Sequence, residues 1–250
     1  MKRILGTELY KLRKSKLFWG MFIYIIVVGF SMVFILQGDD SVDVDEMLSF
    51  TFWDTLGFMN EPTVFMPPSS ITLIYSAVIV IDNSSGYLKD LISFGYGRNK
   101  VFMCKALVFS IASTIISMLF LLAMSIPFGV QCGGMGMQGG FDVVRLILFL
   151  FFMVIIFFSS SYFVFSVIFL IPSPIMIVFS IICTNLVIQM LPVLGVDVSA
   201  FQWTIFYISL NFTPGGFEFM DCLRIVIVAA VTVFACNYFG IRFFNKKELK

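Results

Sequence analysis

Polar side chains that could do chemistry are few in this sequence, because 60% of its 250 residues are hydrophobic and only 12% are charged. The chain has no His, which excludes His-Glu-x-x-His zinc sites, Ser-His pairs and His-ligated haem within it. The five Cys show no Cys-x-x-Cys spacing and are interpreted as packing residues. Cys132 and Cys222 could both lie near one membrane face, but we expect no disulfide between them. No Gly-x-x-x-x-Gly-Lys-Ser/Thr motif is present, so ATP-driven work would need another polypeptide.

Two amides form the most distinctive polar pair. Asn185 and Gln189 are four residues apart and therefore share one face of a helix. They could line a substrate path, although hydrogen bonding between helices is the commoner role of such amides. Ser159, Ser160 and Ser161 give another apolar run a short polar patch. No carboxylate lies in the middle of an apolar run, which argues against a proton-driven carrier.

The elements that must hold these residues are membrane helices. Soluble domains carry about 25% charged residues, and several apolar runs here reach the roughly 20 residues that a helix needs to cross a bilayer. Because lipid offers no hydrogen bonds to the backbone, such runs predict an all-α bundle. We expect six spans, at about 17–36, 62–81, 101–126, 143–171, 175–191 and 223–243, with Pro127 stopping the third.

Two polar stretches flank these spans. Residues 1–16 are too polar to insert, and a helix over them has one apolar face with Ile4, Leu5, Leu9 and Leu12 and one basic face. This pattern predicts a helix that lies in the membrane interface. Residues 193–221 contain the short aromatic run 201–210, which predicts a re-entrant or interfacial helix rather than a span.

The polar stretch 82–100 contains a short amphipathic unit. Its apolar face would hold Tyr87, Leu88, Leu91, Ile92 and Phe94. Ser84 or Ser85 can cap this helix, and Gly95 and Gly97 can end it. A soluble partner could grip such a helix, but it could also be a loop resting on lipid headgroups, and the residues alone favour the loop.

The distribution of charged residues along the sequence predicts the orientation of the chain in the membrane. All of the 16 Lys and Arg residues except Arg145 and Arg224 fall in residues 1–16, 82–105 and the C-terminal tail. Residues 37–61 carry only acidic charges, at Asp39, Asp40, Asp43, Asp45, Glu46, Asp54 and Glu61. Because Lys and Arg concentrate in cytoplasmic loops, both ends of the chain are predicted to lie in the cytosol.

The order of these parts resembles that of the ABC-2-type permeases, the membrane subunits of ABC exporters. The resemblance rests on Glu8-Leu-Tyr-Lys-Leu-Arg-Lys-Ser15 before the first span, and on Asp82-x-x-x-Gly86-Tyr-Leu-Lys-Asp-Leu-Ile before Gly97-Arg98 and Lys105. Within that family, the chain is most similar to the short permeases of lantibiotic-immunity and peptide-export systems. The family usually has Glu four residues before the loop Gly, where this chain has Asp82.

The resemblance implies one permease domain over residues 1–250, in the cytoplasmic membrane of a Gram-positive bacterium. Residues 1–16 would be an elbow helix with Glu8, Lys11 and Arg13, and 193–221 an outer re-entrant segment. The cytosolic loop 82–100 would contact a separate ATPase through Asp82, Ser84, Gly86, Tyr87, Leu88, Lys89, Leu91 and Ile92.

Partners and cofactors follow from the same resemblance. A second permease, identical or homologous, would complete a dimer in the bilayer and move a peptide or lipid-like substrate. This chain would bind no cofactor, with ATP and Mg²⁺ on the ATPase, and no nucleic acid. The alternatives are a substrate-binding membrane module like those of vitamin importers, an immunity protein that acts by binding alone, and, least supported, a membrane enzyme.

The predicted topology can be tested with an epitope tag inserted within residues 39–46. In intact cells, a membrane-impermeant reagent is expected to label this tag, because the acidic loop faces outward. A second tag at the C-terminus should be labelled only after permeabilisation. The reverse pattern would invert the topology.

Overall fold

The computed structural model describes residues 2–16, 18–20, 22–24, 26, 27, 31, 91–131, 140–170, 203–205, 208, 212 and 219–246. Its main elements are α1 (Lys2–Lys14), α7 (Arg98–Gln131), α8 (Gly140–Leu170) and α11 (Phe219–Lys246). The regular structure in these ranges is helical, which confirms the all-α class. The predicted spans at 62–81 and 175–191 lie outside the described residues.

Three of the described helices are long and apolar enough to cross a membrane, over Arg98–Ala123, Val144–Val167 and Phe219–Lys246. They coincide with the third, fourth and sixth predicted spans. One boundary was wrong: α7 continues to Gln131, so Pro127 does not end it. Proline removes one backbone hydrogen bond from a helix, and membrane helices tolerate this loss where neighbouring groups satisfy the freed carbonyl.

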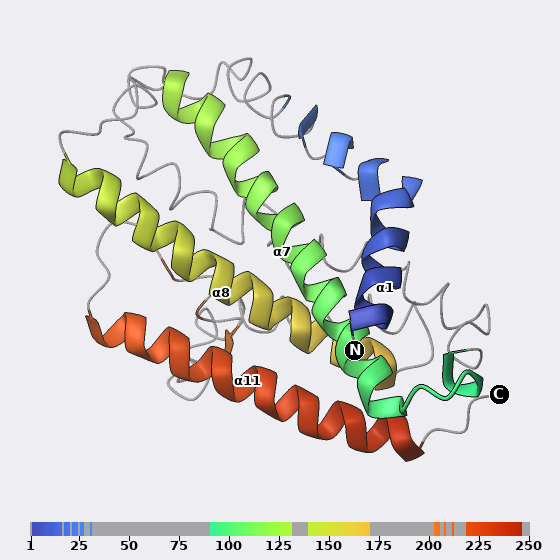
Figure 1. The fold of residues 1–250 in the computed structure, drawn as a ribbon. Coiled ribbons are helices and arrows are strands. Elements are labelled where there is room, and N and C mark those ends of the chain that lie inside the picture. The colour runs from blue at the N-terminus through green and yellow to red at the C-terminus, as the bar shows by residue number, and fades with distance from the viewer. Residues whose placement is uncertain are drawn as a thin grey trace, which may run out of the picture.

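Helix α8 lies between α7 and α11 and packs against both (Figure 1). It runs antiparallel to α7 and roughly parallel to α11, so that the start of α7 and the ends of α8 and α11 gather at one end of the bundle. We call this the basic end, because Arg98, Lys100, Arg242 and Lys246 belong to it. Helix α1 packs along α7.

Phe102 holds the three long helices together near the basic end. Its fully buried ring lies 5.5 Å from that of Phe165 on α8 and 6.1 Å from that of Phe244 on α11, between ring centroids. Gly240 on α11 faces the same ring so closely that a Cβ at this position would overlap it. The absence of a side chain at Gly240 therefore makes room for Phe102.

Phe212 packs beside the first half of α8. The amide of Ile208 donates to the carbonyl of Thr204 (3.1 Å), and that of Phe212 donates to the carbonyl of Ile208 (3.0 Å), which are helical hydrogen bonds. The Phe212 ring stacks on Phe149 of α8, with centroids 5.4 Å apart and planes 7° apart. The described residues Ile205, Ile208 and Phe212 are buried. Apart from residues 203–205 and 208, the predicted short helix at 201–210 lies outside the described residues.

Replacing Gly240 with Ala is expected to destabilise the protein, because the new methyl group overlaps the Phe102 ring in a fully packed core. Overpacking of this kind typically costs about 1–3 kcal/mol. The thermal unfolding midpoint in detergent should therefore fall. Gly6→Ala is the matched control, since nothing lies within 4 Å of a Cβ built at Gly6. Equal midpoints for Gly240→Ala and the wild type would contradict the packing described for Phe102.

Candidate functional site

The structure describes two of the eight candidate coupling residues, Leu91 and Ile92, which lie just before the start of α7 at the basic end. The other six lie outside the described residues: Asp82, Ser84, Gly86, Tyr87, Leu88 and Lys89. Asn185 and Gln189, the candidate substrate path, also lie outside them.

A helical turn over residues 91–93 ends at Gly95. The amide of Gly95 donates to the carbonyl of Ile92 (3.0 Å), and the amide of Tyr96 donates to that of Leu91 (3.3 Å). With Gly95 at φ 85°, this pair of bonds is a Schellman motif, in which glycine takes the left-handed conformation at little steric cost. The prediction that Gly95 ends this helix is confirmed.

Gly97 does not end that helix as predicted but caps the next one. Its carbonyl accepts hydrogen bonds from the amides of Lys100 (3.0 Å) and Val101 (3.2 Å), which open α7. Glycine is among the residues that tolerate the non-helical N-cap position. The turn at 91–95 is therefore joined to α7 by a link of only two residues, Tyr96 and Gly97.

The turn is anchored on one side and exposed on the other. Leu91 is only 8% exposed and belongs to the hydrophobic core, and Ile92 and Tyr96 pack against that core. Phe94, by contrast, is 79% exposed. The sequence pattern placed Phe94 on the same face as Leu91, and this was wrong, because the helix ends before Phe94 and the chain turns there. Leu91 thus fixes the turn, and Phe94 projects from it.

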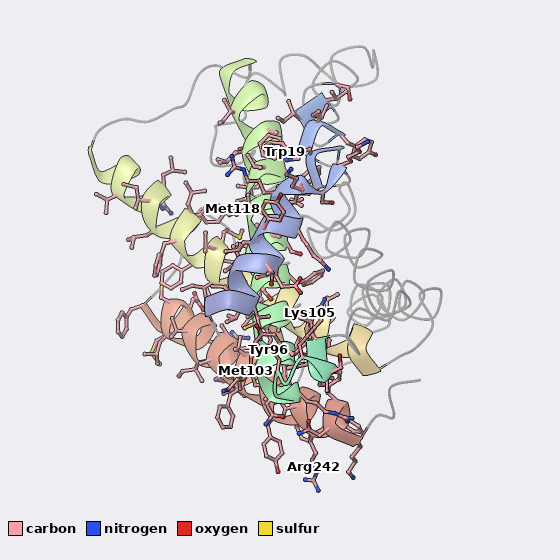
Figure 2. The ribbon with its side chains drawn as sticks, turned by 45° about the vertical axis from the view of Figure 1, so that its right-hand side comes forward. Trp19, Tyr96, Met103, Lys105, Met118 and Arg242 are labelled. Atoms are coloured by element: carbon pink, nitrogen blue, oxygen red, sulfur yellow. The ribbon has the colours of Figure 1, made fainter. Side chains whose placement is uncertain are left out.

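A buried ion pair joins α1 to α7. The Nζ of Lys105 lies 3.4 Å from the Oε1 of Glu8, and the two side chains are 5% and 9% exposed. Figure 2 shows Lys105 on α7 beside α1. Glu8 was predicted to belong to the elbow helix, but its partner was not predicted.

A sequence signal for this burial exists in α1. Ile4, Glu8 and Leu12 are four residues apart, so Glu8 lies in the middle of one helical face. In the structure, this face is turned toward the bundle, with Ile4 buried and Leu12 packed against the core. Leu9, which was predicted to share the apolar face, is largely exposed.

The chain bends where α1 ends. The Ser15 hydroxyl accepts a hydrogen bond from the amide of Phe18 (3.3 Å), as an N-cap of the following helical segment does. The indole Nε1 of Trp19 donates to the carbonyl of Arg13 (2.9 Å), a carbonyl at the end of α1. Lys11 and Arg13 are exposed on α1. The bend separates the amphipathic helix from the first predicted span.

Hydrogen bonds also tie α7 to α11 at the basic end. The Nη1 of Arg98 donates to the carbonyl of Asn245 (3.1 Å), and the Nδ2 of Asn245 donates to the Oδ1 of Asn99 (2.9 Å). The guanidinium of Arg98 is favourably placed at the C-terminal end of α11, because the last carbonyls of a helix carry partial negative charge. The start of α7, next to the exposed turn, is therefore fixed to α11.

Several buried hydroxyls in α7 were missed by the sequence analysis: Ser110, Ser113, Thr114 and Ser117. In α8, Ser159, Ser160 and Ser161 are buried as well. Thr114 donates to the carbonyl of Ser110 (2.7 Å), and Ser160 donates to that of Phe157 (3.1 Å). Small hydroxyl residues that bond within their own helix allow membrane helices to pack closely.

The long apolar helices and the amphipathic helix bound to their basic end define a multi-pass α-helical membrane protein. Residues 4–176 match the sequence model of a family described as ABC-2 family transporter protein. Because this match covers more than half of the chain, the protein belongs to the ABC-2 transporter family. Comparison with curated proteins and with solved structures gives no match. The chain is a membrane component of that family, whose permeases typically pair with ATPase subunits.

Replacing Glu8 with Gln is expected to destabilise the protein, because the Lys105 ammonium stays buried without its carboxylate. Removing one partner of a buried pair typically costs about 3–5 kcal/mol, whereas replacing both by apolar residues is often close to neutral. The unfolding midpoint in detergent should fall strongly for Glu8→Gln and recover partly for Glu8→Leu combined with Lys105→Met. The exposed Lys11→Gln serves as the control. Additive effects of the single changes at 8 and 105 would show that the two groups do not interact.

Proposed function

We propose that this protein is the permease subunit of an ABC exporter and that the turn at 91–95 belongs to the segment that contacts a separate ATPase. The observation that carries this proposal is the exposure of Phe94 on a turn fixed at the basic end. Phe94 lies outside the three candidate spans, so lipid contact within a span does not account for its exposure. Aromatic side chains are frequent anchors at the centres of protein interfaces.

The geometry supports transmission of force from this turn into the membrane helices. The turn is held by Leu91 and is joined to α7 through Gly97, which caps that helix. Phe102 and the contacts of Arg98 then bind the start of α7 to α8 and α11. A push on Phe94 would therefore move several helix ends together. Switching proteins use such rigid-body shifts of packed elements between two arrangements.

The remaining parts of the proposal rest on the family and on the sequence. The residues from Asp82 to Ile92 extend the contact with the ATPase, which carries ATP and Mg²⁺. The basic end faces the cytosol, as the distribution of Lys and Arg predicts. Two permeases, identical or homologous, form the path for an amphipathic substrate, and Asn185 and Gln189 are its candidate polar lining. A peptide as substrate, in a Gram-positive membrane, is supported by the resemblance to lantibiotic-immunity permeases.

Replacing Phe94 with Asp is expected to reduce co-purification of the ATPase by about tenfold or more, because loss of a central aromatic anchor typically costs 2 kcal/mol or more. The measurement is quantitative mass spectrometry of proteins retained by the tagged permease in mild detergent. Phe219→Asp is a matched control, since Phe219 is also 79% exposed but opens α11 at the opposite end.

Comparison of the two variants distinguishes a loss of ATPase binding from a failure of the permease to fold or insert. Both variants should insert into the membrane in wild-type amounts, and only Phe94→Asp should lose the ATPase. Full retention of the ATPase by Phe94→Asp would remove the turn from the interface. If the wild type retains no ATPase under conditions that preserve a known ABC complex, the protein acts by binding alone.

A further inference from the structure

The surface of the basic end carries positive charge without a balancing acid in the stretches 91–100 and 238–246. These stretches contain no Asp or Glu, and their Lys and Arg residues are Arg98, Lys100, Arg242 and Lys246. The last three of these side chains are exposed. Glu8, the acid that packs against α7 from α1, is buried and already paired with Lys105. The exposed cations are therefore available to groups outside the chain.

A hydrogen bond brings these cations together from two helices. The Nδ2 of Asn245 on α11 donates to the Oδ1 of Asn99 on α7 (2.9 Å). Lys100 directly follows Asn99, and Lys246 directly follows Asn245. Arg242 lies four residues before Lys246 and so shares its face of α11. Figure 2 shows Arg242 pointing away from the bundle at this end.

The exposed ring of Phe94 stands beside this group of cations. Phe94 precedes Arg98 by four residues, so the two Cα atoms are at most about 14 Å apart even in an extended chain. The ring is 79% exposed. An apolar centre with a charged rim is the common arrangement of a protein interface. The basic end has both parts of this arrangement.

Anionic lipid headgroups are the other groups that could meet these cations, since Lys and Arg at the cytosolic membrane surface attract them. Headgroups would neutralise the cations but would not bury the Phe94 ring, which lies outside the three candidate spans. A protein surface that combines an apolar pocket with carboxylates does both. The exposed ring and the exposed cations together therefore favour a protein partner.

We propose that the ATPase surface that meets the basic end is acidic, with a pocket for Phe94 and a rim of Asp or Glu carboxylates facing Lys100, Arg242 and Lys246. This inference rests on the proposed function and adds the chemistry of the partner's surface. Charges on the rim of an interface speed association and discriminate between partners more than they add affinity. The basic end thereby selects, among soluble ATPases, one whose docking surface is negatively charged.

Neutralising the cations tests the role of charge. Lys100→Gln combined with Arg242→Gln is expected to lower the ATPase retained by the tagged permease by about tenfold at low salt, because each exposed ion pair contributes a factor of up to about five. Lys100→Arg combined with Arg242→Lys keeps both charges and should retain the ATPase like the wild type. Equal retention by the neutralised variant and the wild type would overturn the acidic rim.

Lys14→Gln combined with Lys16→Gln is the matched control, because it removes two exposed positive charges at and just after the end of α1. Trp19, three residues after Lys16, and Arg242 lie at opposite ends of the bundle in Figure 2. The control should retain the ATPase in wild-type amounts. An equal loss in the control would show a dependence on net charge alone and would overturn the site.

Salt tests the same contact without a substitution. Raising NaCl from about 0.1 M to about 1 M shortens the screening length from about 10 Å to about 3 Å. Retention by the wild type should fall several-fold, and retention by the neutralised variant should change little. The same salt dependence in both would show that Lys100 and Arg242 are not the groups being screened.

Zero-length cross-linking identifies the groups that face the cations. A water-soluble carbodiimide activates a carboxylate, and the amine of Lys100 displaces the activated group to form an amide. Mass spectrometry is expected to find peptides that join Lys100 to an Asp or Glu of the ATPase. Lys100→Arg should lose this product while it keeps the ATPase. Retained ATPase without a cross-link from Lys100 or Lys246 would assign the cations to lipid headgroups and overturn the proposal.

The outcomes separate this inference from the function on which it rests. If the charge variants leave retention unchanged while Phe94→Asp abolishes it, the acidic rim is wrong and the docking turn stands. If the wild type retains no ATPase at low salt, under conditions that preserve a known ABC complex, both are wrong.

Discussion

The buried contact between Glu8 and Lys105 fixes the amphipathic helix to the bundle, and the arrangement of the basic end depends on it. Two opposite charges attract strongly in a medium of low dielectric, but each alone would pay a large desolvation penalty there. A shift of α1 by one turn along α7 would separate both groups from each other while they remained buried. The pair therefore sets the register between a helix at the interface and a helix that crosses the membrane.

Helix α7 connects the turn that we propose contacts an ATPase with α1, α8 and α11. It begins at the cap formed by Gly97, directly after the turn that exposes Phe94. Within its first turns it binds α1 through Lys105 and meets α8 and α11 through the Phe102 ring. Since helices are stiff over such lengths, these contacts make the basic end one mechanical unit. The proposed contact with a separate ATPase would depend on this property.

The contact between α8 and α11 changes in character along its length. Toward the basic end, the hydrogen bond between Tyr162 and Asn237 and the close approach of Gly240 to Phe102 hold the helices tightly. Toward the start of α11, the short side chains Val226, Ala229, Ala230 and Val233 leave an apolar groove against α8. This pair of helices is therefore held most tightly near the basic end.

The sequence alone determined the features that depend on neighbouring residues. Hydropathy marked the helices of α7, α8 and α11, periodicity marked α1, and the special backbone freedom of glycine marked Gly95 as a helix end. Only the tertiary structure decided which distant residues meet. The partnership of Glu8 with Lys105, the space left by Gly240 for Phe102 and the burial of Leu91 in the core all follow from the packing of separate segments. Periodicity shows which residues share a face, but which face a neighbouring helix covers is settled by long-range contacts that no local pattern records.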